Sequence, residues 1–218
     1  MRQYKLRDFP DFLRILEIHH GHQFLFRGVT STRHRLVPKI GRPPLSPVHE
    51  KEMFEEFKRV SRVYLPTTVL NDWELLFIAQ HHGLPTRLLD WTRNPLVAAF
   101  FAVERESKRD GAIYILEAHY TIDTAKETDP FAIKEDAVVA PPHVAARIRS
   151  QAGMFTVHPW PAHPYMPPGI FRVIIPSNQR PEFKKRLHQL GTHSGSIMPD
   201  LDGAAKLVTW EFTKKTKP

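Results

Sequence analysis

The stretch that decides the fold of this chain reads Gln80-His81-His82-Gly83-Leu84-Pro85-Thr86-Arg87-Leu88-Leu89-Asp90-Trp91-Thr92-Arg93-Asn94-Pro95. It places two histidines, two arginines, an aspartate and two threonines between two apolar helical patterns. A short connector needs about one Gly or Pro, whereas an irregular segment this rich in polar groups is typical of a loop that presents side chains to a ligand. The stretch therefore predicts a binding site between two helices.

Upstream of this stretch, apolar residues recur at helical spacing in three places, and one aromatic run indicates a buried strand. The expected helices cover residues 12–18, 50–64 and 71–79, and the expected strand covers residues 24–29. The third helix opens on Asn71, which Glu74 follows at the spacing of a capping box, and Gly83 and Pro85 end it. Arg27 is expected at the end of the strand.

Downstream, Asn94 and Pro95 stand in the order of an N-cap and a first helical position. The helix that they open, residues 96–103, is apolar all round and is expected to be central. Further strands are expected at residues 87–91, 112–117, 153–158 and 171–175, and a further helix at 182–189. These elements predict an α+β fold, a single domain with a small central mixed or antiparallel sheet flanked by helices.

Composition sets the class of protein. The chain has 218 residues, 41% of them hydrophobic and 11% aromatic, which is enough for a real core. The absence of cysteine excludes disulfides, thiolate nucleophiles and Cys-containing zinc sites and fits a reducing compartment. No signal-peptide pattern or long apolar run is present, so we expect a soluble, cytoplasmic protein. The expected domain covers residues 1–212, with its core at 20–176 and a basic tail at 213–218.

Positive charge is concentrated in one part of the chain. The formal net charge is +8 and the sequence pI is about 9.8. No acidic residue occurs between Ile18 and His49, and the residues at 27–42, which we call the basic segment, include Arg27, Arg33, Arg35, Lys39 and Arg42. Two interpretations are open, a solvated surface or an anion-binding surface with nucleic acid as a partner.

Phe26-Arg27-Gly28, the His82-to-Thr92 block and the Leu96-to-Ala102 run together resemble the FRG-domain family, which takes its name from the Phe-Arg-Gly tripeptide. The resemblance covers residues 20–120 and, more weakly, 151–155 and 199–203. The order of elements also looks like the ADP-ribosyltransferase fold. That likeness implies a strand Arg that contacts NAD, here Arg27, and a supporting strand end, here Asp90-Trp91-Thr92. It also implies a later Glu, where this chain has Gln151 and Gly153.

The chemistry of NAD cleavage agrees with several of these residues. The planar Arg27 fork suits a pyrophosphate or ribose, and Gly28 lets a ligand approach the backbone. Loss of nicotinamide builds positive charge on the ribose, which calls for an aromatic wall and a carboxylate. The expected catalytic residues are His81, His82, Asp90 and Gln151. The expected NAD-binding residues are Arg27, Gly28, Thr86, Arg87, Trp91, Thr92 and Phe101.

Structural roles compete with these assignments. Arg27 can form a surface ion pair, and Asp90 can cap the helix that follows it. One of the two histidines can cap its helix end, and Arg87 can anchor the loop to Asp90 rather than clamp a phosphate. Either Asp90, Asp200 or Asp202 replaces the missing Glu, or the site only binds. No metal site is expected, because the 13 histidines lack metal-ligand spacing.

The expected function is that of an NAD-dependent ADP-ribosyltransferase-like enzyme, with NAD as a substrate and a nucleic-acid base as the candidate acceptor. The alternative is a non-catalytic FRG module that binds a nucleotide or nucleic acid. A third and weaker hypothesis is a glycosidase-like enzyme that acts on nucleoside bonds.

Overall fold

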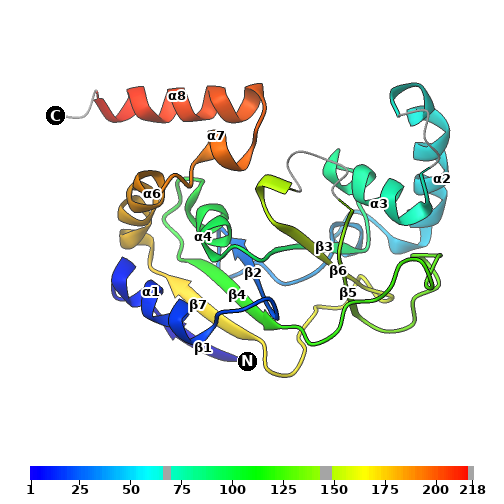
Figure 1. Cartoon of the computed structure of the whole chain (residues 1–218), viewed down its shortest axis with the longest axis horizontal. Coiled ribbons are helices and arrows are strands. Elements are labelled where there is room, and N and C mark those ends of the chain that lie inside the picture. The colour runs from blue at the N-terminus through cyan, green and yellow to red at the C-terminus, as the bar shows by residue number, and fades with distance from the viewer. Residues whose placement is uncertain (66–69, 143–148, 216–218) are drawn as a thin grey trace.

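A mixed sheet of seven strands lies at the centre of the computed structural model, which describes residues 1–65, 70–142 and 149–215 (Figure 1). The strand order is β1-β7-β4-β2-β3-β6-β5, and only the β1–β7 pair is parallel. The strands are β1 (Arg2–Lys5), β2 (Phe24–Val29), β3 (Leu88–Thr92), β4 (Gly111–Glu117), β5 (Ala137–Val139), β6 (Gly153–Val157) and β7 (Phe171–Ile175). The single α+β domain is confirmed, and its sheet is wider than expected.

Helices cover the two halves of the sheet separately (Figure 1). The half formed by β7, β4 and β2 packs against α1 (Phe9–Ile18), α4 (Pro95–Val103) and α6 (Arg180–Gln189). The half formed by β3, β6 and β5 packs against α2 (Glu50–Ser61) and α3 (Asp72–His81). Helices α7 (Ser194–Ile197) and α8 (Leu201–Lys215) follow α6 along the chain. Helix α4 is the central helix that its uniformly apolar sequence predicts.

Gly28 sets the distance between α4 and the sheet. A Cβ atom at this position would lie 1.8 Å from the carbonyl oxygen of Ala98 and 2.8 Å from the backbone nitrogen of Ala102. The absence of a side chain therefore allows the α4 backbone to rest directly on β2. The sequence interpretation explained Gly28 as a position where a ligand approaches the backbone. The structure shows instead that Gly28 is needed for the packing of α4 on β2.

The sheet opens between β2 and β3. These strands share one residue pair, Phe26 with Thr92, whereas β2 pairs with β4 along its whole length. Beyond that pair the two strands diverge. The sequence interpretation placed Arg27 at the end of its strand, but the residue lies inside β2. Its side chain reaches across the gap to the backbone carbonyl of Asp90 in β3.

Four described elements were not predicted from the sequence. Strand β1 consists of exposed residues, and β5 has three residues. Helix α7 occupies a segment that reads as a Gly/Ser turn, and α8 continues to Lys215, past the start of the expected tail at 213. Short or exposed elements carry little hydrophobic periodicity, which explains why the sequence did not reveal them.

Helices within residues 1–65, 70–142 and 149–215 are all too short or too polar to cross a membrane.

Candidate functional site

A cavity of about 440 Å³ lies where β2 and β3 diverge, and we call it the central pocket. Its lining comes from β2, β3, the ends of α3 and α4, and the segment before β6. Eight of the residues singled out from the sequence line it: Arg27, Gly28, His81, Asp90, Trp91, Thr92, Phe101 and Gln151. Segments that are far apart in the sequence thus meet at one concave site.

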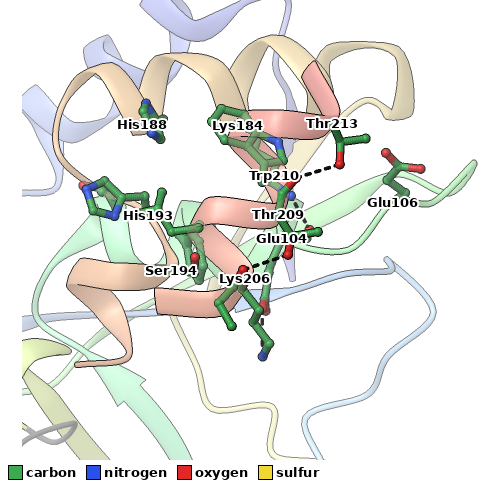
Figure 2. Close-up of a pocket in the computed structure, with 14 residues that line it drawn as sticks. Glu104, Glu106, Lys184, His188, His193, Ser194, Lys206, Thr209, Trp210 and Thr213 are labelled. Atoms are coloured by element: carbon green, nitrogen blue, oxygen red, sulfur yellow. Dashed lines mark hydrogen bonds and ion pairs between the residues drawn. The ribbon is translucent and has the colours of Figure 1, made fainter. Parts of the chain in front are cut away.

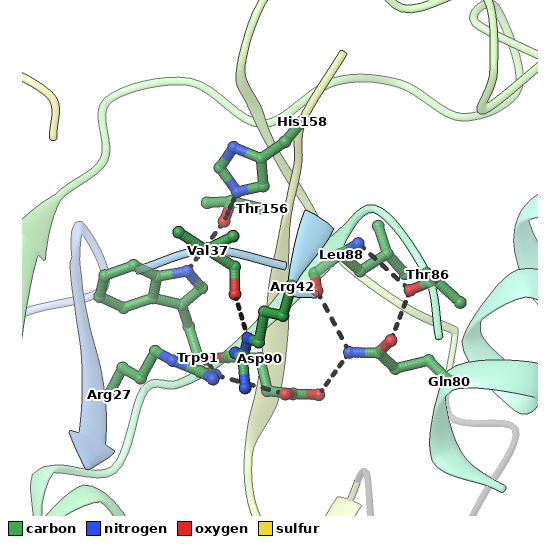
Figure 3. A network of polar contacts seen from close by, with 10 residues as sticks. All are labelled: Arg27, Val37, Arg42, Gln80, Thr86, Leu88, Asp90, Trp91, Thr156 and His158. Atoms are coloured by element: carbon green, nitrogen blue, oxygen red, sulfur yellow. Dashed lines mark hydrogen bonds and ion pairs between the residues drawn. The ribbon is translucent and has the colours of Figure 1, made fainter. Parts of the chain in front are cut away.

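Arg27 bridges the opening in the sheet (Figure 3). Its Nη1 donates to the backbone carbonyl of Asp90 and lies 3.3 Å from Asp90 Oδ2, and the side chain is 17% exposed. The Arg27 Nε atom is buried and has no hydrogen-bond partner among the described residues. The ion pair considered as the structural role of Arg27 is therefore present. It lies in the wall of the pocket, however, and it leaves the Arg27 Nε donor without a partner among the described residues.

Asp90 offers a carboxylate to the same pocket. Its side chain is 61% exposed and accepts a hydrogen bond from Gln80 Nε2 at 3.1 Å in addition to the contact with Arg27. The capping interpretation of Asp90 is wrong, because Asn94 caps α4 by accepting from the backbone nitrogen of Leu96 at 2.9 Å. Most of the Asp90 carboxylate remains available to a ligand.

Gln80 connects this carboxylate to the protein interior (Figure 3). Its side-chain nitrogen donates to Asp90 and, at 3.3 Å, to the carbonyl of Leu88, while its oxygen accepts from the hydroxyl of Thr86. Thr86 was expected to contact NAD, but it is fully buried and does not line the central pocket. It supports the Gln80 side chain instead. The sequence interpretation gave Gln80 no role, although it opens the decisive stretch.

Thr92 and Gln151 hold the rim of the pocket together. The Thr92 hydroxyl donates to the carbonyl of Gln151 at 2.5 Å, and Gln151 Nε2 donates to the carbonyl of Ile197 at 3.1 Å. Both residues line the pocket, but these hydrogen bonds join parts of the protein to one another. Gln151 is an amide and supplies no negative charge there.

The Trp91 indole is anchored on the side of β3 opposite to Asp90, since neighbouring strand residues point to opposite faces. Its Nε1 donates to Thr156 Oγ1 at 2.9 Å, and Thr156 Oγ1 lies 2.7 Å from His158 Nε2 (Figure 3). Because a carboxylate only accepts, His158 Nδ1 donates to Asp136 Oδ1 at 2.8 Å, and the Thr156 hydroxyl links His158 Nε2 to the indole. This buried chain fixes the indole and leaves Phe101 as the more suitable aromatic wall.

Two further predicted residues lie outside the central pocket. Arg87 neither contacts Asp90 nor lines this pocket; its Nε lies 2.9 Å from Glu50 Oε2, and its guanidinium lies 4.8 Å from the centre of the Phe131 ring. His82 is the C-cap of α3, where its backbone nitrogen donates to the carbonyl of Ile78 at 3.0 Å. Its ring stands edge to face with that of His81 at 4.9 Å, and only His81 lines the pocket.

The structure adds charged residues that the sequence interpretation missed. His34, Glu104 and Arg105 also line the central pocket, and Glu104 follows directly on the last residue of α4. Neither Asp200 nor Asp202 lines it, and Asp200 Oδ1 instead accepts from the backbone nitrogen of Gly203 at 2.9 Å. Glu104 is therefore the second carboxylate in the lining of the pocket. Its location directly after the Phe-rich run of α4 is the sequence signal that could have identified it.

Another cavity, of about 420 Å³, lies between α6, α7 and α8 (Figure 2). His188, His193 and Trp210 line it, and His188 Nε2 lies 3.0 Å from Glu211 Oε1. Partial burial and the neighbouring His188 lower the pKa of His193, against the opposing effect of Glu211. None of the residues predicted to bind or cleave NAD lines this cavity.

Comparison with known proteins identifies one family. The family model described as the FRG domain matches residues 22–111, a range that includes β2, the decisive stretch and α4. The match confirms the resemblance seen in the sequence. No curated protein and no solved structure matches the chain.

Proposed function

We propose that this chain, which belongs to the FRG-domain family through residues 22–111, is an NAD-dependent ADP-ribosyltransferase-like enzyme. The observation that carries the proposal is the gathering of Arg27, Asp90, Phe101 and His81 around one cavity at the opening between β2 and β3. A guanidinium, a carboxylate, an aromatic ring and an imidazole are the groups that cleavage of a dinucleotide requires.

Each group has a step in the reaction. Arg27 binds the pyrophosphate of NAD with donors that the Asp90 contacts leave unused, and Phe101 packs against the nicotinamide. The bond between ribose and nicotinamide breaks, and its electron pair leaves with nicotinamide. The carboxylates of Asp90 and Glu104 stabilise the positive charge that develops on the ribose. The acceptor forms the new bond to that carbon, and His81 takes the proton that the acceptor loses.

The acceptor in this proposal is a base of a nucleic acid. The basic segment begins within β2 at Arg27, and its other arginines line a cavity that shares Arg27 with the central pocket. Clustered Lys and Arg favour polyphosphate partners because binding releases condensed counterions. The lack of cysteine is in keeping with work in the cytoplasm.

A second candidate function, a module that binds a nucleotide or nucleic acid without chemistry, is favoured by one observation. Gln151 stands where the ADP-ribosyltransferase likeness calls for a Glu, and its side-chain nitrogen is engaged with the carbonyl of Ile197. An amide at this position stabilises a cationic ribose much less than a carboxylate does. In this case NAD or nucleic acid binds and no nicotinamide is released.

Incubation of the purified chain with NAD and single-stranded DNA or RNA tests the proposal. We expect nicotinamide release together with a labelled acceptor, measured by chromatography. Asp90→Asn is expected to lower the rate about 100-fold, because it removes a preorganised charge that acts on the transition state. Glu55→Gln, which changes an exposed carboxylate of α2, is the matched control.

Four results separate the hypotheses. Release of nicotinamide with transfer to the acceptor supports the proposed enzyme, and release of free ADP-ribose without an adduct supports a glycosidase. Intact NAD with every acceptor, combined with a rise in melting temperature on NAD addition, identifies the non-catalytic module. Intact NAD without any thermal shift contradicts both NAD-dependent functions.

A further inference from the structure

A second cavity, of about 410 Å³, adjoins the central pocket, and we call it the basic pocket. Arg27, Val29 and His34 line both cavities, so one wall is shared. The cationic and titratable groups of its lining are Arg27, Arg33, His34, Arg35 and Arg42. Among the described residues that line it, none is acidic.

The backbone that carries these cations is held in place. A Cβ atom on Gly41 would lie 1.8 Å from the carbonyl oxygen of Pro161, so this segment packs directly against the proline-rich loop. The Arg42 Nε donates to the carbonyl of Val37 at 2.8 Å, and the Tyr114 hydroxyl donates to the carbonyl of His34 at 3.2 Å. The backbone of this segment and the Arg42 side chain are therefore held in place before any ligand arrives, which lowers the entropic cost of binding.

Apart from Arg27, which pairs with Asp90, the arginines of the basic pocket are not neutralised by carboxylates of the described residues. Within the described part of the chain, Arg33, Arg35 and Arg42 form no ion pair with a carboxylate. Although much of the His34 side chain meets solvent, partial burial and the charges of Arg42, Arg109, Arg105 and Arg27 lower its pKa. Burial and the charge of Arg27 likewise lower the pKa of Arg42, and only Asp90 opposes this. An anion in the pocket would relieve this repulsion.

The chemistry of the lining favours a phosphodiester over other anions. Guanidinium groups match phosphate oxygens in a two-pronged geometry, and several of them spaced along a segment suit a ligand with repeated phosphates. A base inside a duplex is stacked and shielded, so an enzyme reaches its atoms in a single strand or after extrusion. A cavity of this size accepts about one nucleotide at a time.

We propose that the basic pocket binds the phosphodiester backbone of a single-stranded nucleic acid and presents the adjoining base to the central pocket across the wall formed by Arg27 and His34. The presentation of the base rests on the proposed function, whereas the binding of the strand does not. Arg33 and Arg35 are the residues specific to the strand, because they line the basic pocket and not the central one.

Fluorescence anisotropy with a labelled single-stranded oligonucleotide tests the inference. The double variant Arg33→Ala/Arg35→Ala is expected to bind the oligonucleotide more weakly and to lower the slope of log affinity against log salt by about 1.4, from about 0.7 per lost phosphate contact. The double variant Arg59→Ala/Arg62→Ala removes the same charge at two exposed positions that line neither pocket, and it is expected to keep the slope. Urea unfolding confirms that both variants are folded.

Two further measurements separate this inference from the proposed function. Inorganic pyrophosphate is expected to compete with the oligonucleotide, and the thermal shift caused by NAD is expected to be the same in wild type and in Arg33→Ala/Arg35→Ala. If the double variant loses the NAD shift and keeps the oligonucleotide slope, the pocket holds NAD and the inference is wrong. An oligonucleotide affinity equal to that of the Arg59→Ala/Arg62→Ala control also overturns it. Loss of nicotinamide release alone leaves strand binding intact and counts only against the enzyme.

Discussion

Arg27→Ala is expected to abolish nicotinamide release and to weaken NAD binding about 100-fold, as is typical when one partner of a partly buried, charge-assisted contact is removed. Arg27 is the side chain that spans the opening between β2 and β3, and its Nε has no partner among the described residues. Its loss removes the fork proposed to bind the pyrophosphate. Titration calorimetry with NAD measures the effect directly.

Two controls distinguish a loss of NAD contacts from a loss of folding. Arg27→Lys keeps the positive charge but loses the planar fork, so an intermediate affinity is expected. Urea unfolding of Arg27→Ala shows whether lost pairing with the Asp90 carbonyl weakens the fold as well. Wild-type affinity for NAD in a folded Arg27→Ala protein would mean that the guanidinium only joins the two strands.

Arg87→Ala is expected to lower the free energy of unfolding by about 3–5 kcal/mol, because it leaves a buried charge without its partner. Glu50 is 2% exposed and Arg87 is 12% exposed, and Glu50 Oε1 also accepts from the backbone nitrogen of Arg87 at 2.6 Å. The pair ties the start of α2 to the start of β3. Urea denaturation followed by circular dichroism provides the measurement.

The pH dependence of this variant has a definite sign. Burial raises the pKa of Glu50, while the charge and hydrogen bonds of Arg87 act in the opposite direction. Without Arg87 the folded-state pKa rises further above the unfolded value, so the folded variant binds a proton where the unfolded chain does not. The variant therefore regains part of its lost stability as the pH falls from neutral through the raised pKa, and the difference in unfolding free energy between variant and wild type becomes smaller.

An exposed pair supplies the comparison. Arg59 and Glu56 form an ion pair on the surface of α2, so Arg59→Ala is expected to cost less than about 1 kcal/mol. If Arg87→Ala lowered the free energy of unfolding by no more than Arg59→Ala does, and if this loss did not depend on pH, Glu50 would not be held as a buried charge.

Local signals made several elements predictable. The capping box of Asn71 and Glu74 is present at the start of α3, and Asn94 with Pro95 opens α4. Each signal acts within one helical turn and needs no knowledge of the rest of the fold. Strand β1 has no such signal, because its residues are exposed and it forms by pairing with β7, a strand far away in the sequence.

The candidate site was predictable as a group of residues more than as a geometry. The irregular stretch indicated where polar side chains gather, but not which of them face the cavity. Arg87 turns to Glu50, 37 residues earlier in the sequence, and Trp91 turns to the face opposite to Asp90. Such choices depend on contacts between distant elements, which neither periodicity nor spacing encodes.

A crystal structure with a carbocyclic NAD analogue that resists cleavage would show whether NAD binds where β2 and β3 diverge. We expect the pyrophosphate on the Arg27 guanidinium, with the nicotinamide beside Phe101 and the adjoining ring carbon facing Asp90. An analogue bound between α6, α7 and α8, with the central pocket empty, would refute NAD binding between these strands.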